Sequence, residues 1–526
     1  MNSWILLPVL LPAVAGMCLL FASLREHRRG SSEASKAVGG AGAVIKGGAS
    51  LKEIHFFSAV VLLVTAVLAL TAAWSGERSV TLFYLMKDIP IYFHVDGVGK
   101  LFVSFMTVVW LLVGFYSFTY MKHEGDEKRF FGLFLLVYGV LIGLDFSGNL
   151  VTMYLFYELL TLASMPMVMH SGTHESIMAA LKYLFYSMCG AYMGLFGIFF
   201  LYRYCDTLTF VPGGSLNQSA LFGHEGFLLV VVFVTLVGFG AKAGMFPLHA
   251  WLPAAHPVAP CPASAVLSGV IVKAGVLAAV RVVYYMVGTS FLRGTWVQTA
   301  WMVLSLSTVF MGSMLAYREK VFKKRLAYST VSQVSYILFG LSLMQPEAMT
   351  GALMHVVFHA FIKCALFLTA GVFLFQYGKT RVEELSGLGK KMPVALWAYT
   401  FASLALIGIP PASGFISKWH LAEGALAADV GVFRYVGPAV LLVSALLTAG
   451  YLLPITMNGF FPGRKAAPES TPEGFAAGAQ PARQEKGEPP FGMLIPLILL
   501  AALSLLSGIF PGPLEHFVSD IVGTLM

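Results

Sequence analysis

The sequence predicts an all-α polytopic membrane protein, and two features of its composition lead to that fold class. Of 526 residues, 58% are hydrophobic and only 11% are charged, whereas soluble domains carry about 25% charged residues. The apolar residues gather in stretches of about twenty, the length that an α-helix needs to cross a bilayer. These stretches lack the alternation of apolar and polar positions that a membrane β-barrel requires.

About fourteen apolar stretches are expected to cross the membrane as helices. The first has no Lys or Arg ahead of it and is too long for a signal peptide, so we expect it to be retained. In chain order the predicted spans are residues 3–23, 54–75, 97–120, 130–147, 150–170, 176–202, 227–250, 261–287, 297–317, 326–344, 348–377, 395–424, 435–458 and 491–511.

The basic residues of the connecting loops fall mostly on one side of the membrane. With the N-terminus outside, the inside loops hold Lys and Arg clusters within 25–52, 122–129, 318–325, 379–391 and 464–486. The positive-inside rule then predicts a protein of the inner (cytoplasmic) membrane with both termini on the outer face. The net charge of +8 follows from this topology and gives no support for binding to nucleic acid.

Two segments resemble linkers rather than domains. Residues 30–51 are rich in Gly, Ala and Ser, and residues 463–490 have a disordered composition. Neither is long enough for a soluble domain, and the chain has no glycine-rich phosphate-binding motif beside a strand. The five cysteines form no CxxC pair that would suggest a disulfide frame or an iron–sulfur cluster. No cofactor is therefore expected in this chain, and no redox or hydrolytic site.

Prolines interrupt the seventh and twelfth predicted spans in a similar way. Pro247 follows Lys242 by five residues, and Pro410 and Pro411 precede Lys418. Proline removes a backbone donor, and a broken helix in lipid persists only where it packs in protein or lines a wet cavity. Two broken helices, each with a lysine beside the break, are typical of internally duplicated transporters with sites near mid-membrane. Two ordinary proline kinks are the simpler alternative.

Ionisable residues inside the spans are the most informative feature of this sequence. A charge at the bilayer centre costs roughly 3 kcal/mol on insertion scales, so such residues indicate an ion or proton pathway. The candidate ion-translocation residues are Glu158, Lys242, Lys273, His355, His359, Lys363 and Lys418.

Three of these residues form a regular stripe in the sequence "MHVVFHAFIK". His355, His359 and Lys363 are spaced at i, i+4 and i+8, so a helix places them in one row about 12 Å long. Histidines exchange protons near neutral pH, and the stripe is predicted to pass protons toward Lys418. Zinc is the weaker alternative, because Val356 replaces the glutamate of a metalloprotease helix and no third ligand is evident. Haem is a further alternative, but axial haem ligation needs suitably placed histidines on facing helices, and the sequence shows no second such set within the spans.

Glu158 and Lys242 are predicted to act together. Opposite charges about 7 Å apart interact by roughly 2–3 kcal/mol at an effective dielectric constant near 20. A change in the glutamate would therefore change how tightly the lysine holds its proton. His249 and His256 flank a loop and are expected to serve packing or access, while Lys182 and Arg281 are expected near the membrane interfaces.

Several motifs then resemble those of a known family. "HAWLPAAHPVAPCPASAVLSGVIVKAGVLAAVR", "RLAYSTVSQVSYILFG", "HVVFHAFIKCALFLTAG", "GIPPASGFISKW" and "FHVDGVGKLF" resemble segments of the antiporter-like subunits of respiratory complex I. Membrane-bound NiFe hydrogenases, formate hydrogenlyases and Mrp-type Na⁺/H⁺ antiporters contain relatives of these subunits. Two residues depart from the family pattern, since Tyr157 stands where many relatives have tryptophan and Ala254 where aspartate is common.

The resemblance implies a fold of about fourteen core helices in which spans 4–8 and 9–13 are inverted five-helix repeats, each with a broken helix. It divides the chain into residues 1–129 (helices 1–3 with a Gly/Ala-rich cytoplasmic loop), 130–287 and 297–458 (the two repeats), 459–490 (a cytoplasmic linker) and 491–526 (the last helix and the C-terminus). The proton-pathway positions of the family fall on the seven candidate residues, and Lys418 places the chain with members that carry lysine at the last position.

The function hypothesis follows from the motifs and the buried charges together. We expect an ion-translocating subunit of a membrane-bound oxidoreductase complex, of hydrogenase or complex I type. Partner membrane subunits would surround it, and iron–sulfur clusters, a NiFe centre or flavin would reside in other subunits. An Mrp-type antiporter subunit without redox chemistry is the main alternative, and a purely structural subunit is another. The choice between H⁺ and Na⁺ stays open, although Ser413 and Ser417 could offer oxygen ligands to sodium.

Overall fold

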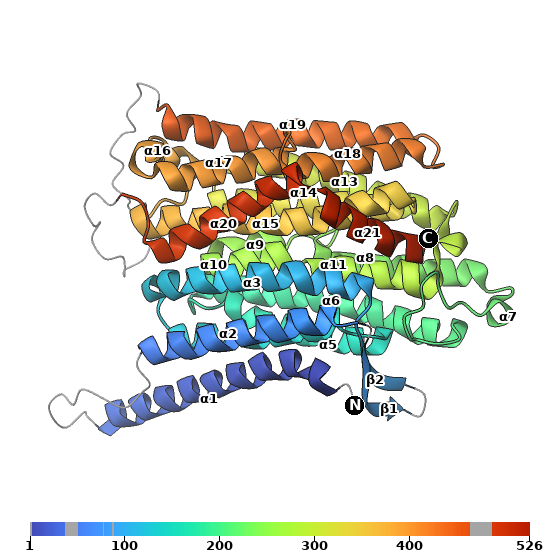
Figure 1. Ribbon diagram of the computed structural model, residues 1–526, viewed down its shortest axis with the longest axis horizontal. Coiled ribbons are helices and arrows are strands. Elements are labelled where there is room, and N and C mark those ends of the chain that lie inside the picture. Colours follow the sequence, from blue (N-terminus) through green and yellow to red (C-terminus); the bar gives the residue numbers. More distant parts are fainter. Residues whose placement is uncertain (1–2, 37–50, 77, 87–88, 463–486) are drawn as a thin grey trace.

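The protein is a bundle of long helices with one small β-hairpin (Figure 1). The computed structural model describes residues 3–36, 51–76, 78–86, 89–462 and 487–526. Its α-helices are α1 (Leu7–Lys36), α2 (Leu51–Trp74), α3 (Gly97–Glu124), α4 (Glu127–Asp145), α5 (Leu150–Val168), α6 (His174–Tyr204), α7 (Gln218–Leu221), α8 (Glu225–Ala243), α9 (Leu252–Val258), α10 (Cys261–Val266), α11 (Lys273–Val280), α12 (Thr289–Leu292), α13 (Trp296–Arg318), α14 (Phe322–Ser342), α15 (Pro346–Tyr377), α16 (Leu388–Lys391), α17 (Pro393–Ile407), α18 (Ser413–Ala427), α19 (Phe433–Phe460), α20 (Phe491–Ile509) and α21 (Gly512–Leu525).

The predicted all-α membrane fold is confirmed. A helix occupies each predicted span, and eleven spans in the described residues are long and apolar enough to cross a membrane. The other three are α4 and α14, which carry charged residues in their first turns, and the pair α17 and α18, each of 15 residues. The exact count of fourteen therefore stays a prediction, as do the segment boundaries. Most of the two predicted linkers lies outside the described residues, at 37–50 and 463–486.

The two ends of the bundle carry different connecting segments. One end, here called the basic end, carries the loops around Lys320 and Arg381, which lie together because Val321 forms a β-bridge with Arg381. The opposite end, the hairpin end, carries strands β1 (Ser79–Met86) and β2 (Ile89–His94), and the C-terminus lies toward it (Figure 1). The antiparallel hairpin pairs Ser79 with His94 and was not predicted from the sequence.

Both predicted helix breaks are present. The first lies between α8 and α9 and begins at Gly244, whose φ of 79° is left-handed, a conformation that glycine adopts without strain. The second lies between α17 and α18 and begins at Gly408, with a φ of 91°. In the first break the Trp251 indole Nε1 donates to the Ala241 carbonyl at 2.9 Å. This bond satisfies one of the carbonyls that a helix end leaves free.

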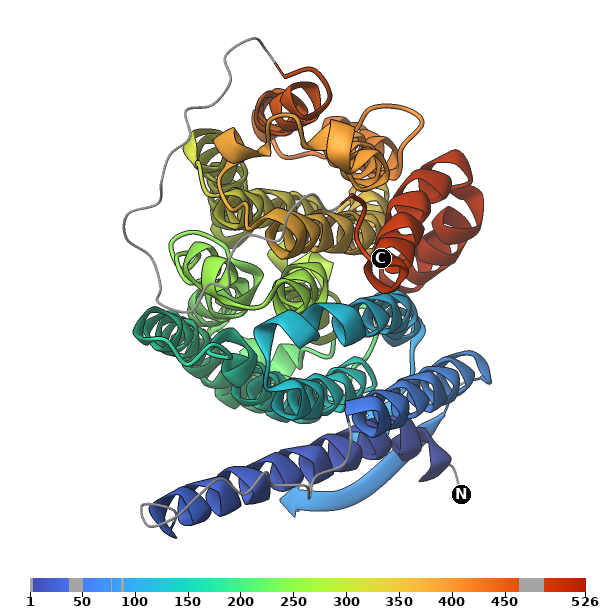
Figure 2. The ribbon, with the colours of Figure 1, turned by 90° about the vertical axis from the view of Figure 1, so that its left-hand side faces the viewer.

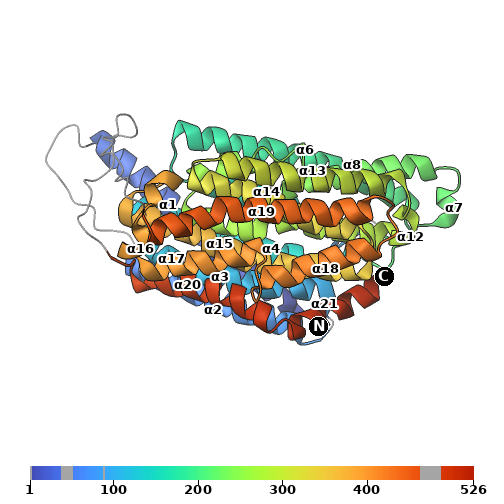
Figure 3. The same ribbon diagram turned by 90° about the horizontal axis from the view of Figure 1, so that it is seen from above.

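Two spans whose most apolar 18-residue stretches are entirely buried form the centre of the bundle. They are α15 and the span from Cys261 to Val287, which combines α10 and α11 with π-helical turns at Leu267–Ile271 and Arg281–Val287. These spans pack against each other. Figure 2 gives a view along the helix axes. The helices of the first repeat lie beside those of the second repeat, and α1 and α2 lie on one flank. In Figure 3, α20 and α21 lie along one side, where they contact α3 and α15.

Candidate functional site

The seven candidate residues come from five helices of the bundle. Lys242, Lys273 and the three stripe residues are at most 1% exposed, whereas Glu158 and Lys418 are partly exposed. The seven side chains lie on α5 (Glu158), α8 (Lys242), α11 (Lys273), α15 (His355, His359, Lys363) and α18 (Lys418).

Lys242 lies in the last turn of α8, directly before the first break. Its Nζ atom donates to the Tyr157 carbonyl at 2.8 Å and to the Thr161 hydroxyl at 2.7 Å, both on α5. The ammonium also lies 3.8 Å from the centre of the Tyr157 ring. A helix C-terminus favours a cation, and an aromatic face does the same. Tyr157 thus supplies both an acceptor and an aromatic face to the Lys242 ammonium.

Glu158 follows Tyr157 on α5 and acts on Lys242 through space rather than through a hydrogen bond. Its Oε1 atom has no hydrogen-bond partner in the described protein, while Lys242 donates to other groups. The same face of α5 exposes Leu155 and Leu159, at 38% and 47%. The carboxylate therefore stands at the edge of the bundle, within the electrostatic reach of Lys242.

Lys273 joins the two repeats. Its Nζ atom donates to the Ser268 carbonyl at 2.7 Å and lies 2.6 Å from the Nδ1 atom of His359 on α15. Ser268 belongs to the π-helical turn Leu267–Ile271, and such turns alter the regular backbone hydrogen-bond pattern at functional positions. The contact with His359 connects the first-repeat span to the predicted stripe.

The stripe on α15 has the geometry that its spacing predicted. The His355 and His359 rings lie 5.9 Å apart between centroids, and the Nδ1 atom of His355 is 2.8 Å from the Ser417 hydroxyl. Lys363 points to α14 instead, where its Nζ donates to Ser329 Oγ at 2.6 Å. The stripe therefore meets three other helices, and its proton-carrying role stays a prediction.

Lys418 lies just after the second break and next to Ser417. Its Nζ atom donates to the Leu406 and Ile407 carbonyls at 2.6 and 2.9 Å. These carbonyls close α17, so the ammonium caps the first half of its own broken helix. The Tyr336 ring lies 5.1 Å from the same ammonium. Lys418 is thus held by backbone carbonyls and an aromatic face.

The sequence interpretation missed Gln333, which lies on α14 between Ser329 and Tyr336. These three positions share one helix face, and α14 packs against α15. Gln333 is fully buried, and neither of its side-chain polar atoms has a hydrogen-bond partner in the described protein. The Nε2 atoms of His355 and His359 are also buried without a hydrogen-bond partner in the described protein. Buried polar atoms usually bind a partner or an ordered water, and the polar "STVSQVSY" run was the available signal.

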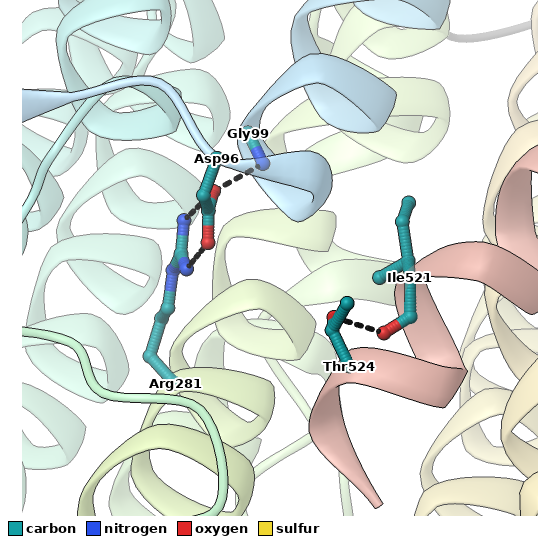
Figure 4. A network of polar contacts seen from close by, with 5 residues as sticks. All are labelled: Asp96, Gly99, Arg281, Ile521 and Thr524. Atoms are coloured by element: carbon teal, nitrogen blue, oxygen red, sulfur yellow. Dashed lines mark hydrogen bonds and ion pairs between the residues drawn. The ribbon is translucent and has the colours of Figure 1, made fainter. Parts of the chain in front are cut away.

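A second missed feature is an ion pair at the hairpin end (Figure 4). Asp96 accepts hydrogen bonds from both terminal nitrogens of Arg281, the Nη2 to Oδ1 bond measuring 2.8 Å. Asp96 also accepts from the Gly99 backbone amide at 2.9 Å, which caps α3. Arg281, expected near an interface, is only 1% exposed, so its charge is satisfied by protein. The pair fixes the start of α3 against the end of the Cys261–Val287 span.

No group of three or more His, Cys, Asp or Glu side chains in the described ranges could hold a metal ion. In the HxxxH pair, the Nδ1 atoms of His355 and His359 face Ser417 and Lys273. The surroundings of this pair therefore consist of a hydroxyl and an amine rather than a third histidine or a carboxylate.

Two broken helices with a line of buried lysines and histidines between them define a membrane protein of the ion-transporter class. The family model "NADH:quinone oxidoreductase/Mrp antiporter, TM" matches residues 147–449. A second, described as "NADH-Ubiquinone oxidoreductase (complex I), chain 5 N-terminus", matches residues 86–131. The chain therefore belongs to the NADH:quinone oxidoreductase/Mrp antiporter family, and the resemblance inferred from its motifs is confirmed.

Proteins named as parts of three kinds of complex are similar in sequence to this chain. NADH-quinone oxidoreductase subunit N of Desulforudis audaxviator is 33% identical, over 78% of this chain and 81% of the relative. A Na(+)/H(+) antiporter subunit of Bacillus subtilis is 27% identical, over 100% of this chain and 98% of the relative. Hydrogenase-4 component B of Escherichia coli is 29% identical, over 78% and 61%.

Solved structures share the fold. A chain of the membrane-bound sulfane sulfur reductase, an archaeal respiratory membrane complex, matches 99% of this chain and 97% of its own length with a TM-score of 0.79 at 22% identity. A chain of the Mrp complex from Dietzia sp. matches 100% and 97% with a TM-score of 0.77, also at 22% identity. Both belong to multi-subunit membrane assemblies, which agrees with the expected partner subunits.

Proposed function

We propose that this chain translocates protons as an antiporter-like subunit of a membrane-bound oxidoreductase complex of hydrogenase or complex I type. One observation supports this function above the others. The contact of 2.6 Å between Lys273 and His359 joins the buried lysines of the first repeat to the histidine stripe of the second. A line of titratable side chains thereby runs through the middle of the bundle.

Glu158 is the residue through which a neighbouring subunit would control the path. Its carboxylate favours the protonated state of Lys242 by charge attraction. When the carboxylate is neutralised or turns to another partner, Lys242 holds its proton less tightly and releases it. Glu158 is partly exposed beside exposed Leu155 and Leu159, so a partner subunit can reach it. The partner would cover this apolar face of α5 at the same time.

The released proton then moves toward Lys273, with water as the carrier between the two lysines. A protonated Lys273 donates to the neutral Nδ1 atom of His359, and the imidazole passes the charge on to His355. His355 faces Ser417 at 2.8 Å, and Lys418 is the next residue. Because Lys418 lies on the hairpin-end side of the second break, it is the exit site.

The orientation of the chain follows from its charges. The loops around Lys320 and Arg381 are basic and lie together at one end of the bundle. The positive-inside rule supports an orientation with the basic end in the cytoplasm and the hairpin end, with both termini, outside the inner membrane. Protons would thus leave the cytoplasm when redox chemistry elsewhere drives the path.

The redox cofactors belong to partner subunits in this proposal. Iron–sulfur clusters with a NiFe centre or a flavin would supply the driving reaction there. Relatives named as subunits of a quinone oxidoreductase and of an F(420)H(2) dehydrogenase support such a parent complex.

A second candidate is an Mrp-type antiporter subunit without redox chemistry. The similarity to the Na(+)/H(+) antiporter protein of Bacillus subtilis extends over 100% of this chain, which favours it. Metal and flavin analysis of the intact complex, purified gently through a tag on this chain, separates the two. Nickel with iron, or iron with flavin, supports an oxidoreductase parent. A stable assembly without metal or flavin supports the antiporter.

A further inference from the structure

A groove opens on the side of the bundle where α2, α3, α15 and α21 meet. Helix α21 contacts both α3 and α15, and the ring of Trp74, the last residue of α2, lies 5.1 Å from the Phe517 ring of α21. The groove has a volume of about 330 Å³, within the range of about 300–1,000 Å³ that is typical of sites for small molecules. The described residues that line it are apolar except for Ser104 and the Trp74 indole, and these two hydrogen-bond to each other at 3.1 Å. The lining therefore suits an apolar ligand.

The groove follows α3 from the hairpin end toward the middle of the membrane. Ser104 and Val108 line it on α3, four and eight residues after Lys100, so these three side chains form one row about 12 Å long. Val357 and Phe361 of α15 also line it. Each of them follows a stripe histidine by two residues, which is the opposite side of a helix. A molecule in the groove would thus touch the back of the helix that carries the stripe.

A lysine without a partner lies beside the hairpin end of this groove. Lys100 is partly exposed, and its side chain forms no ion pair or hydrogen bond with another residue of the described chain. The carboxylate one turn earlier, Asp96, is occupied by Arg281 and by the Gly99 amide. The positive charge of Lys100 is therefore available to an anion from outside the chain.

We propose that the groove binds one acyl chain of an anionic phospholipid and that Lys100 pairs with the phosphate of its headgroup. The lipid would come from the leaflet at the hairpin end, where the exposed Trp74 lies as tryptophans do at the level of the headgroups. An apolar helix of a partner subunit would cover the groove but would leave Lys100 without a counter-charge. This inference rests on the membrane fold and not on the proposed proton path.

Photoreactive lipid tests the proposal on the intact complex in phosphatidylcholine vesicles. The probe is a minor fraction of phosphatidylglycerol that carries a diazirine near the middle of one acyl chain, and phosphatidylcholine with the same chain is the zwitterionic comparison. Irradiation, digestion and mass spectrometry locate the adducts. We expect phosphatidylglycerol adducts on Phe361, which is only 8% exposed and is poorly accessible to lipid that merely surrounds the bundle. Adducts on Phe199 of α6, 70% exposed, report that surrounding lipid.

Two variants test the apolar and the charged contact separately. Val108→Trp fills the groove and should remove the adducts on Phe361, whereas Val443→Trp, at an exposed position of α19, is the matched control and should keep them. Lys100→Gln should lower the preference for phosphatidylglycerol over phosphatidylcholine by about fivefold, the usual contribution of one lysine near an anionic membrane surface. Arg203→Gln, exposed at the end of α6, should leave this preference unchanged.

The proposal is overturned if the unchanged complex shows no adduct on Phe361, or if the adduct persists in Val108→Trp. Equal labelling by the two lipids overturns the choice of an anionic headgroup. If Val108→Trp does not assemble, Leu514→Trp narrows the groove from α21 and should remove the same adduct. The labelling does not depend on proton flux, so its outcome is independent of the proposed function.

Discussion

The two broken helices place their lysines in different ways. In the first repeat Lys242 precedes the break and donates across to α5. In the second repeat Lys418 follows the break and donates back to the carbonyls that close α17. Both ammonium groups lie near a tyrosine ring, Tyr157 at 3.8 Å and Tyr336 at 5.1 Å. The two sites thus share a lysine and an aromatic face but differ in their acceptors.

The two lysine sites differ most in the charge of the residue that follows each tyrosine. Glu158 follows Tyr157, whereas the fully buried Ile337 follows Tyr336. A mobile or titrating carboxylate changes the proton affinity of a neighbouring lysine, but fixed carbonyls cannot be switched in that way. In the proposed function, the first site is therefore the one that a partner subunit controls, and the second is the one that releases protons constantly. Substitutions at the two sites should differ accordingly in the size and the pH dependence of their effects.

The largest expected effect is that of Lys242→Ala. Removal of the first lysine interrupts the only proposed link between Glu158 and the stripe, so flux through the assembled complex should fall by about 100-fold or more. Flux into liposomes and the yield of intact complex are the measurements. Lys390→Ala, on the exposed basic end, is the control and should leave both unchanged. Normal flux in assembled Lys242→Ala would contradict the account.

Glu158→Gln should have the next largest effect. It removes a charge that stabilises protonated Lys242 by roughly 2–3 kcal/mol if the two groups are about 7 Å apart. At 1.36 kcal/mol per pKa unit, this loss lowers the proton affinity of Lys242 by about 30-fold or more, so we expect the flux to fall by at least about tenfold. Because Lys242 then holds its proton less tightly, a raised pH should worsen the defect, and a lowered pH should partly restore the proton on Lys242. Only the first site has this carboxylate, so this pH dependence should be confined to it.

The measurement for Glu158→Gln is flux as a function of pH. Glu175→Gln, exposed in the first turn of α6, is the control. A defect that does not vary with pH would show that Glu158 acts by packing rather than through Lys242.

A smaller effect is expected from Ser417→Ala in the second repeat. The substitution removes the hydroxyl that lies 2.8 Å from the His355 Nδ1 atom, a hydrogen bond that contributes about 1 kcal/mol. Flux should decrease by about fivefold, with no change in the pH dependence set by Glu158. The exposed Ser171→Ala is the control. A loss as large as that of Lys242→Ala would mean that Ser417 itself carries the ion, as a sodium ligand would.

The smallest effect is expected from Tyr157→Phe. The ring near Lys242 and the backbone carbonyl are kept, and the lost hydroxyl has no hydrogen-bond partner in the described protein. Flux should stay within about twofold, whereas Tyr157→Leu removes the ring and should reduce it by about tenfold. Equal defects in the two variants would assign the role to the hydroxyl instead of the aromatic face.

Local sequence patterns predicted much of this molecule because their physical causes are local. Long apolar stretches predicted the membrane helices, and the prolines predicted both breaks. The four-residue spacing of His355, His359 and Lys363 placed them on one face of α15. Each of these conclusions depends on neighbours within a few helical turns.

Other features depend on contacts between distant segments, which spacing does not encode. The link between Lys273 and His359 spans two repeats, and the Asp96–Arg281 pair joins α3 to the Cys261–Val287 span. The β1–β2 hairpin was missed because its apolar strand "SVTLFYLM" reads as a loop between two membrane helices. Gln333 was missed because the polar run "STVSQVSY" does not show which of its side chains lies without a partner in the folded bundle.

Proton flux through the assembled complex carrying Lys273→Gln is the most direct test of the central claim that the ion crosses from one repeat to the other. Lys273 is 1% exposed and makes the contact with His359, so no second route is proposed there. The account predicts an assembled complex in which flux is lost and both flanking sites are intact. Unchanged flux in assembled Lys273→Gln would contradict the account.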